Sequence, residues 1–382
     1  MNSPEINEQA ELDRALRGLF GSDDVVVSNW NQQAPGTPGV SGAIVTRLSG
    51  TASVDGQPRP WSLIRKWIMS PERRQVNPTA RNETPSGIDY WKREFLVYQS
   101  GVLDDLPAGF TRPRCLHTQE QEDGCTLWLE VVEEELTIWP LSRYDLAAYH
   151  LGCFNGSYLS ARALPDYPWL SVEIAQQRER KNGELFAQFD ELRQHPVVRR
   201  GWPDEVADGI LRIWQEREQF YRILRQLPQV FQHGDAGRRN LMAVTGKNGA
   251  SKTFAIDWGY AGVGAVGEEI AATVISPAIW YQGVTPEQLP ELEAIVLDGY
   301  IAGLRQAGWH GDGQLARLGY LCSVALRYGP MITIPEILAL NWKNGDEVKQ
   351  RFGWSIEEWA DTLAPIRHFV IQRADQARQL MA

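Results

Sequence analysis

Residues 231–240 read Phe-Gln-His-Gly-Asp-Ala-Gly-Arg-Arg-Asn, and this stretch decides the expected fold. Within it, His233, Asp235 and Asn240 follow the order His-x-Asp-x-x-x-x-Asn. This spacing is typical of catalytic loops that hold a carboxylate base beside a metal ligand. A short strand-like run then leads into a second aspartate, Asp257. The three-residue pattern alone is only suggestive, and the run that ends in aspartate makes it specific.

The chemistry of phosphoryl transfer explains why these residue types stand together. A carboxylate must reach the attacking hydroxyl, and separate oxygen ligands must hold the Mg²⁺ that bridges the phosphates of ATP. Asp235 is the candidate base, and Asn240 and Asp257 are the candidate metal ligands. His233 is expected to orient the loop backbone rather than to transfer protons. The alternative is that His-Gly-Asp forms a tight turn capped by the aspartate, with Asn240 starting a strand.

These blocks resemble the aminoglycoside phosphotransferase and choline kinase superfamily, whose members share the bilobal fold of protein kinases. The resemblance extends from about Ser41 to Ala271. It implies an α+β, bilobal protein-kinase-like fold. Residues 1–132 would form a small, strand-rich nucleotide-binding lobe, and residues 133–382 a larger helical lobe with the catalytic loop and the acceptor site.

The resemblance also implies a lysine on an N-terminal strand and a glutamate on a nearby helix. Lys66, in the strand-like run 61–68, would hold the α- and β-phosphates of ATP, and Glu94, in the helical run 90–99, would fix the lysine by ion pairing. Arg65 is a rival for the lysine role, but strand alternation puts the two cations on opposite faces. The alternative is a solvated strand edge with the glutamate on a helix surface.

Two further blocks are assigned to the nucleotide by the resemblance. Gly39 and Gly42 lie between two strand-like runs, where backbone amides can approach phosphate oxygens. A hairpin turn rich in glycine and proline would show the same pattern. The buried-type strand 126–132 resembles the hinge between the lobes, where main-chain groups from Glu130 to Val132 would bind adenine.

The chain departs from the family pattern in three places. Trp258 follows the metal-binding aspartate where protein kinases carry phenylalanine, and Arg238 and Arg239 stand just before the loop asparagine. Glu269 occupies a position past the metal ligand where the family usually has aspartate. None of these changes removes a ligand, but the arginines are expected to alter what lies near the phosphates.

Composition fits a globular enzyme and excludes some partners. The 382 residues are 43% hydrophobic and 23% charged, and the length suffices for two lobes. A net charge of -10 argues against a nucleic-acid partner, because a phosphate backbone calls for a basic footprint. No apolar run reaches membrane-spanning length, no secretory signal is visible, and the four cysteines lack metal-ligand spacing. A cytoplasmic location is expected.

Hydrophobic periodicity orders the rest of the chain. It predicts strands and one clear helix up to about residue 132, then helices over 142–161, 169–193 and 203–227, and helices again after Gly267. Together with the site residues, this favours an ATP-dependent kinase that phosphorylates a hydroxyl of a small molecule. A nucleotide-binding protein without turnover is the alternative. A protein kinase is disfavoured, because no long activation segment ending in Ala-Pro-Glu follows the metal-binding aspartate.

The acceptor cannot be named from a fold and a catalytic loop that many kinases share. One hypothesis is a cationic small molecule, drawn by the net charge of -10 and by the carboxylates of Glu268 and Glu269. The alternative, which the sequence favours, places this pair at the N-terminus of the next helix, with Glu269 bracing the catalytic loop.

Overall fold

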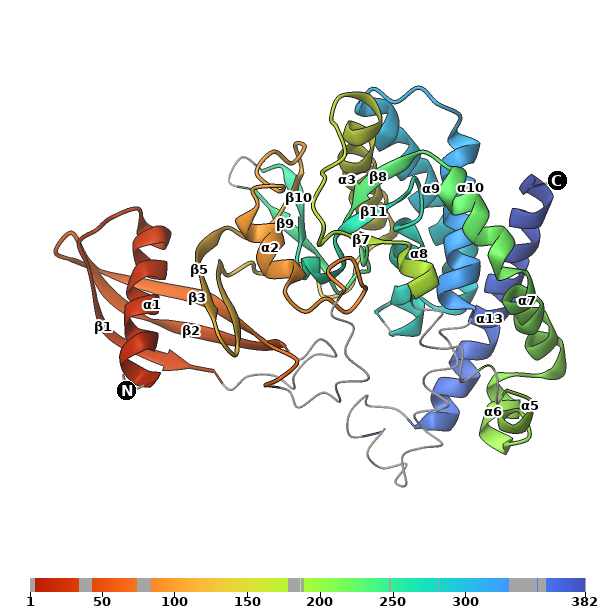
Figure 1. The fold of residues 1–382 in the computed structure, drawn as a ribbon, viewed down its shortest axis with the longest axis horizontal. Coiled ribbons are helices and arrows are strands. Elements are labelled where there is room, and N and C mark those ends of the chain that lie inside the picture. The colour runs from red at the N-terminus through yellow and green to blue at the C-terminus, as the bar shows by residue number, and fades with distance from the viewer. Residues whose placement is uncertain are drawn as a thin grey trace.

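The computed structural model of the protein describes residues 4–33, 43–73, 84–177, 186, 189–246, 249–280, 282–329, 349 and 355–381. A strand-rich N-terminal lobe and a larger helical lobe lie side by side, and the two termini lie at opposite ends of the molecule (Figure 1). This order of elements agrees with the predicted α+β, bilobal architecture. The strand that leads out of the first lobe ends at Glu130, and a lobe boundary between residues 132 and 133 stays a prediction.

The N-terminal lobe is built on a five-stranded antiparallel sheet in the order β1-β2-β3-β6-β5. Its strands are β1 (Val25–Gln32), β2 (Ala43–Val54), β3 (Gln57–Met69), β5 (Cys115–Gln121) and β6 (Gly124–Glu130). Side chains alternate between its faces, as strand geometry requires. Leu63 packs in the core cluster with α1 (Pro4–Phe20), whereas Ile68 packs in the cluster with α2 (Arg93–Gln99).

Helix α1 is an element that the sequence reasoning did not predict. Leu12, Ala15 and Leu16 are fully buried and form a cluster with Trp61 and Trp128 of the sheet. The spacing of three and four residues between them is the helical signal that was available. The helix covers one face of the sheet, so the opposite face is the one that carries α2.

The second lobe is mainly helical. Its longer helices are α3 (Leu141–Ser160), α7 (Asp204–Gln226), α8 (Ile270–Ile279), α9 (Leu289–Gln306), α10 (Gly313–Ser323) and α13 (Ile356–Met381). The shorter ones are α5 (Phe189–Leu192), α6 (Pro196–Gly201), the 3₁₀-helices η2 (Trp258–Tyr260) and η3 (Pro286–Gln288), and the π-helix η4 (Val324–Tyr328). The helices predicted for 142–161 and 203–227 are confirmed.

Glycines let α3 and α9 approach closely in this lobe. A Cβ added at Gly152 would stand 2.1 Å from the carbonyl oxygen of Tyr300, and one at Gly303 would stand 2.1 Å from that of Tyr149. Real side chains cannot approach so closely, so any larger residue would push the two helices apart.

The helix predicted for 169–193 is wrong at its start. Ser171 and Val172 form the short strand β7, which pairs in parallel with β11 (Gly262–Ala265). The tertiary contact overrides local periodicity here: a Cβ at Gly262 would stand 2.1 Å from the carbonyl oxygen of Ser171, so glycine is what admits the strand.

Two small three-stranded sheets place the catalytic blocks. One has the order β4-β10-β9 and the other β7-β11-β8. Their remaining strands are β4 (Phe110–Thr111), β8 (Gln229–Gln232), β9 (Leu241–Thr245) and β10 (Ser251–Ala255). The loop 233–240 joins β8 to β9, and Asp257 follows β10. The hairpin β9–β10 therefore brings the loop asparagine and the second aspartate to the same place.

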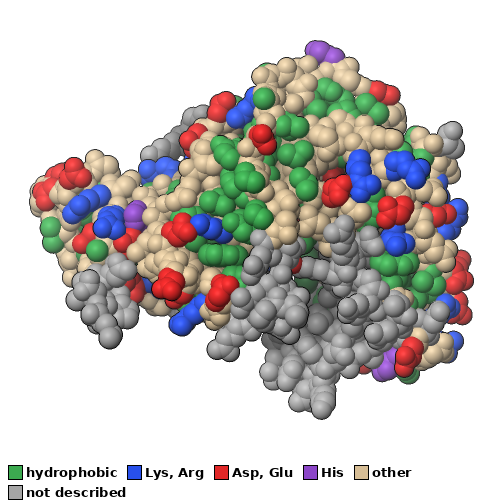
Figure 2. Space-filling view, viewed as in Figure 1, with side chains coloured by type: hydrophobic (Ala, Val, Ile, Leu, Met, Phe, Trp, Pro, Cys, Tyr) green, Lys and Arg blue, Asp and Glu red, His purple; other side chains and the backbone are tan. Residues whose placement is uncertain are grey.

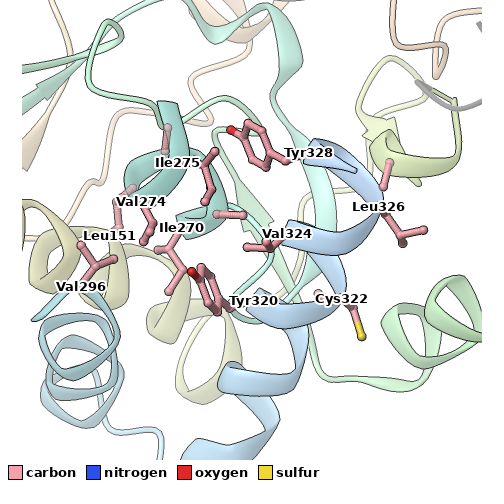
Figure 3. Close-up of a cluster of buried hydrophobic side chains, with 14 of the residues drawn as sticks. Leu151, Ile270, Val274, Ile275, Val296, Tyr320, Cys322, Val324, Leu326 and Tyr328 are labelled. Atoms are coloured by element: carbon pink, nitrogen blue, oxygen red, sulfur yellow. The ribbon is translucent and has the colours of Figure 1, made fainter. Parts of the chain in front are cut away.

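Apolar side chains of α8, α10 and η4 fill the interior of the helical lobe. Figure 3 shows Val324 and Tyr328 of η4 turned toward Ile270 and Ile275 of α8. The face seen in Figure 2 carries cationic and anionic side chains interspersed, with apolar side chains gathered near its middle. None of the described helices is long and apolar enough to cross a membrane.

Candidate active site

The catalytic loop begins at the end of β8 with a sharp turn at Gly234. Its φ of 79° lies in the left-handed region, and a Cβ there would stand 2.3 Å from the carbonyl oxygen of Tyr260. Only glycine combines this conformation with this approach. The turn reverses the chain between His233, which is fully buried, and Asp235, whose side chain is partly exposed.

His233 acts within this loop as a spacer between two backbone segments. Its Nε2 lies 2.8 Å from the carbonyl oxygen of Ile256, and its Nδ1 accepts a hydrogen bond of 3.2 Å from the backbone N–H of Asp235. A ring that donates from Nε2 and accepts at Nδ1 is neutral. Burial lowers the pKa of His233, which favours the same neutral form. The geometry is that of an orienting residue and offers no proton to a substrate.

Glu269 stabilises the backbone at the start of the catalytic loop. Its Oε2 accepts hydrogen bonds from the backbone N–H of His233, at 2.8 Å, and from that of Gly234, at 3.4 Å. The residue is 2% exposed and precedes the first turn of α8. Its neighbour Glu268 is also buried and accepts from the backbone N–H of Ala265 at 2.9 Å. The structure therefore gives Glu269 the bracing position that the sequence favoured.

We predict that Glu269→Gln changes how stability depends on pH. Burial raises the pKa of Glu269 from 4.5 to about 7, so the folded state binds this proton more tightly than the unfolded chain does. The contribution of protonated Glu269 to the free energy of unfolding is complete below about pH 4.5 and is lost as the pH rises to about 7. This loss is on the order of 3 kcal/mol. The wild type should thus lose stability relative to the glutamine variant across this window.

Urea unfolding of both proteins at several pH values would measure this difference. Exchange of an exposed carboxylate on α9, Glu291→Gln, is the matched control. A difference between wild type and Glu269→Gln that stays constant with pH would contradict the assignment.

Asn240 and Asp257 face the same region because the main chain links their segments. The backbone N–H of Ile256, next to Asp257, donates to the carbonyl oxygen of Asn240 at 2.9 Å. The Nδ2 of Asn240 donates to the backbone oxygen of Asp235 at 2.9 Å and to its Oδ2 at 3.0 Å. With the amide nitrogen engaged, the amide oxygen is the group of Asn240 that remains for a metal ion.

Asp257 adopts an unusual backbone conformation at the end of β10. Its φ of 61° and ψ of 64° lie in the left-handed region, which non-glycine residues seldom visit. Its side chain is 43% exposed, and the charge of Lys66 lowers its pKa. The two candidate ligands thus offer a carboxylate and an amide oxygen, the donor types that Mg²⁺ takes beside phosphates and water. The donor set fits the predicted ion.

Lys66 joins the two lobes at this point. Its Nζ lies 2.5 Å from Oε2 of Glu94 on α2 and 2.8 Å from Oδ1 of Asp257. Burial alone would lower the pKa of Lys66, but the charges of Asp257 and Glu94 outweigh burial and raise it. The ammonium group therefore stays charged. Arg65 lies on the other face of β3, where it pairs with Glu8 of α1, so Lys66 is the cation that the strand presents to Glu94 and Asp257.

Trp258 and Arg238, two of the departures from the family pattern, are buried structural residues. Trp258 is fully buried, and its ring lies 4.6 Å from that of His233. The guanidinium of Arg238 pairs with Glu134 at 3.3 Å, donates to the carbonyl oxygen of Leu136 at 2.7 Å, and stacks 4.3 Å from the ring of Trp139. These partners hold the side chain of Arg238 beside the segment that follows β6, and the expectation that the two arginines alter what lies near the phosphates stays a prediction.

Glu130 and Val132, the two residues predicted to bind adenine, differ in their main-chain hydrogen bonds. The backbone N–H of Glu130 donates to the carbonyl oxygen of Arg114 at 3.0 Å, so this N–H is not available to adenine. Among the described residues, the main chain of Val132 has no hydrogen-bond partner. Of the two hinge residues predicted, Val132 is thus the one with free main-chain groups. Gly39 and Gly42 lie outside the described residues.

One charged residue at the site carries no motif and was not predicted. Arg327 of η4 pairs through Nη2 with Oδ1 of Asp235, and its Nη1 donates to the carbonyl oxygen of Gly234 at 3.2 Å. It is 8% exposed. The sequence around it, Val324-Ala-Leu-Arg-Tyr328, shows only an apolar helical segment with one arginine, so no pattern points to the catalytic loop.

Part of the chain matches the model of a known protein family, and the fold is similar to that of solved structures. Residues 161–310 match the model of the phosphotransferase enzyme family, APH. Over 96% of each chain, the fold is similar to that of the amicoumacin kinase hAmiN, solved in complex with AMP-PNP, Ca²⁺ and Ami, with 12% identity and a TM-score of 0.51. It is also similar to spectinomycin phosphotransferase APH(9)-Ia, in complex with ADP and spectinomycin, with 12% identity, a TM-score of 0.52, and 97% of this chain and 98% of that one covered.

No curated protein matches the sequence. At 12% identity the two solved structures carry the fold and not the acceptor. The predicted resemblance to the phosphotransferase superfamily is confirmed, and so is the α+β fold of the protein-kinase type.

Proposed function

We propose that the chain, which matches the phosphotransferase enzyme family over residues 161–310 and has a kinase-like fold, transfers the γ-phosphoryl group of ATP to a hydroxyl group of a small molecule. One observation carries the proposal. Lys66 of the first lobe contacts both Glu94 and Asp257, and the segment of Asp257 is hydrogen-bonded to that of Asn240. A protein that only binds nucleotide has no chemical need for all of these groups beside a base.

Each side chain has a distinct part in this reaction. Asp235 orients the acceptor hydroxyl and accepts its proton as the bond to phosphorus forms. Lys66 holds the α- and β-phosphates as a point charge, and Glu94 keeps its ammonium group in place. The main chain of Val132 would bind the adenine edge. His233 and Glu269 keep the loop backbone fixed while the base acts.

The proposed cofactors are ATP and Mg²⁺, with Asn240 and Asp257 as the protein ligands of the ion. When bound, Mg²⁺ would neutralise the negative charge that develops on the transferred phosphoryl group. Among the described residues, no three His, Cys, Asp or Glu side chains gather as a metal cage. Such a cage is not required, because Mg²⁺ in this chemistry is held by one or two protein oxygens together with phosphates and water.

The acceptor is proposed as a small molecule, without nucleic acid or membrane as partner. The net charge of -10 still favours a cationic acceptor. The carboxylates that first suggested it do not support it, because Glu269 binds the loop backbone and Glu268 binds that of Ala265. All four cysteines are free thiols, which fits a reducing compartment, and we place the reaction in the cytoplasm.

A screen of hydroxyl compounds for acceptor-dependent ATP consumption tests the function. The set should include amine-bearing, neutral and anionic alcohols, each at low and high ionic strength, with the Asp235→Asn protein as blank. We expect one chemical class to stimulate ATP consumption in the wild type and not in the blank. Equal consumption by both proteins, or transfer to none of the compounds, would contradict the proposal. A cationic acceptor should show a KM that rises with salt.

A further inference from the structure

Arg327 reaches the catalytic loop from a part of the chain that no catalytic motif includes. It lies beyond residues 161–310, which match the family model, on the π-helix η4 that continues α10. Single π-helical turns inside α-helices occur frequently at functional sites. The irregular turn directs Arg327 to Asp235, 92 positions earlier in the chain, and to the carbonyl oxygen of Gly234.

The π-helix η4, which carries Arg327, packs closely against α8. Val324 is fully buried and Tyr328 is 2% exposed, and Figure 3 shows both turned toward α8. Helix α8 begins directly after Glu269, which accepts hydrogen bonds from the backbone N–H groups of His233 and Gly234 in the same loop. The side chain of Thr273 on α8 also donates to the carbonyl oxygen of Ala236 in the loop, at 2.7 Å. Helix α8 is thus a common support for the loop and for η4.

The carboxylate of Asp235 is held at both oxygens. Arg327 contacts Oδ1, and the Nδ2 of Asn240 donates to Oδ2 at 3.0 Å. Two donors on opposite oxygens fix the rotation of the carboxylate.

We propose that Arg327 is a positioning residue of the reaction: it fixes the carboxylate of Asp235, and the loop turn at Gly234, in the orientation that the acceptor hydroxyl requires. A guanidinium suits this task because its planar fork serves a carboxylate oxygen and a carbonyl oxygen together. Its burial would be costly without these partners. The inference rests on the proposed kinase function, because it assigns Asp235 the role of base.

The test combines Arg327→Met, Arg327→Lys, Asp235→Asn and the double variant Arg327→Met with Asp235→Asn. Arg317→Met, on α10, is the matched control. We expect Arg327→Met to lower kcat by roughly ten- to a hundredfold, the effect of a small misplacement of a reacting group, with the KM for ATP unchanged. Arg327→Lys should recover part of the loss. In the Asp235→Asn background, Arg327→Met should lower kcat no further.

Thermal unfolding of the same proteins gives a readout that needs no turnover. Asp235→Asn removes the carboxylate that pairs with the buried guanidinium of Arg327, and Arg327→Met removes the cation that pairs with Asp235, so the double variant should lose less stability than the sum of the single losses. Additive losses would overturn the pairing itself. An unchanged or higher kcat in Arg327→Met, or a rise confined to the KM for the acceptor, would overturn the positioning role.

Failure of the kinase proposal looks different from failure of this inference. In that case the wild type transfers phosphate to no acceptor, although the unfolding data still show a coupled pair. That result would overturn the positioning role of Arg327 together with the proposed function. Retained transfer in the wild type, with uncoupled variants, would overturn the inference alone.

Discussion

Asp235→Asn should lower turnover by a factor of roughly a hundred or more, because general-base assistance is typically worth that much. The amide keeps the size of the carboxylate and can still accept a hydrogen bond from Arg327, but it cannot take a proton from the acceptor. Binding of Mg²⁺-ATP should survive, since Lys66, Glu94 and Asp257 are untouched. Steady-state turnover on the acceptor found in the screen, together with calorimetric binding of Mg²⁺-ATP, measures both parts.

The control for this variant concerns stability. Removing the charge of Asp235 leaves the buried guanidinium of Arg327 without its carboxylate, and because the Asp235 side chain is 29% exposed the loss of stability should stay below the about 3 to 5 kcal/mol typical of a fully buried pair. Turnover must therefore be compared at a temperature where melting curves show both proteins folded. Asp298→Asn, an exposed change on α9, is the matched control. Wild-type turnover in the folded Asp235→Asn protein would remove Asp235 as the base.

Asp257→Ala should weaken binding of Mg²⁺-ATP by about tenfold or more. Loss of an outer-shell partner alone commonly weakens a metal site that much, and Asp257 is proposed as a direct ligand. The change also frees Lys66 from one of its two carboxylates, which leaves Glu94 as its remaining partner. ATP affinity can be measured by calorimetry, once with Mg²⁺ and once with a chelator. Mg²⁺ should increase the ATP affinity of the variant much less than that of the wild type.

A second variant separates the ligand from the backbone. Asp257 has φ of 61°, a conformation that alanine adopts less readily than asparagine. Asp257→Asn keeps that conformation better and removes only the negative charge. If both variants lose metal dependence, the carboxylate is the cause, whereas a loss in Asp257→Ala alone points to the backbone. Unchanged affinity and metal dependence in both proteins would move the metal site elsewhere.

The candidate site residues could be expected to lie together because their spacing in the sequence is short. His233, Asp235 and Asn240 lie on one loop, and a loop of that length between two strands leaves few ways to arrange them. Lys66 could be preferred over Arg65 on the family's use of lysine, and strand alternation predicted that only one of them enters the cleft. The structure adds the partners: Glu94 and Asp257 for the lysine, and Glu8 for the arginine.

The environment of those residues could not be predicted in the same way. Arg238 stands two residues before Asn240, yet its side chain binds Glu134, 104 positions away in the chain. The sequence allowed two interpretations of Glu269: a carboxylate that attracts a cationic acceptor, or a carboxylate that supports the catalytic loop. Only its burial and its hydrogen bonds to the loop backbone distinguish them. Exposure and partner are properties of packing, which local periodicity does not contain.

Sequence patterns alone indicated the resemblance to the phosphotransferase family, the α+β kinase-like fold, and the candidate groups that a phosphoryl transfer would use. These follow from residue type and from separations of a few positions, which the backbone geometry constrains directly. Only the tertiary structure decided what holds those groups. Arg327 meets Asp235 because α10 and η4 pack on α8, across 92 positions of chain. A contact of that kind depends on how apolar faces come together in the core, and no spacing rule in the sequence records it.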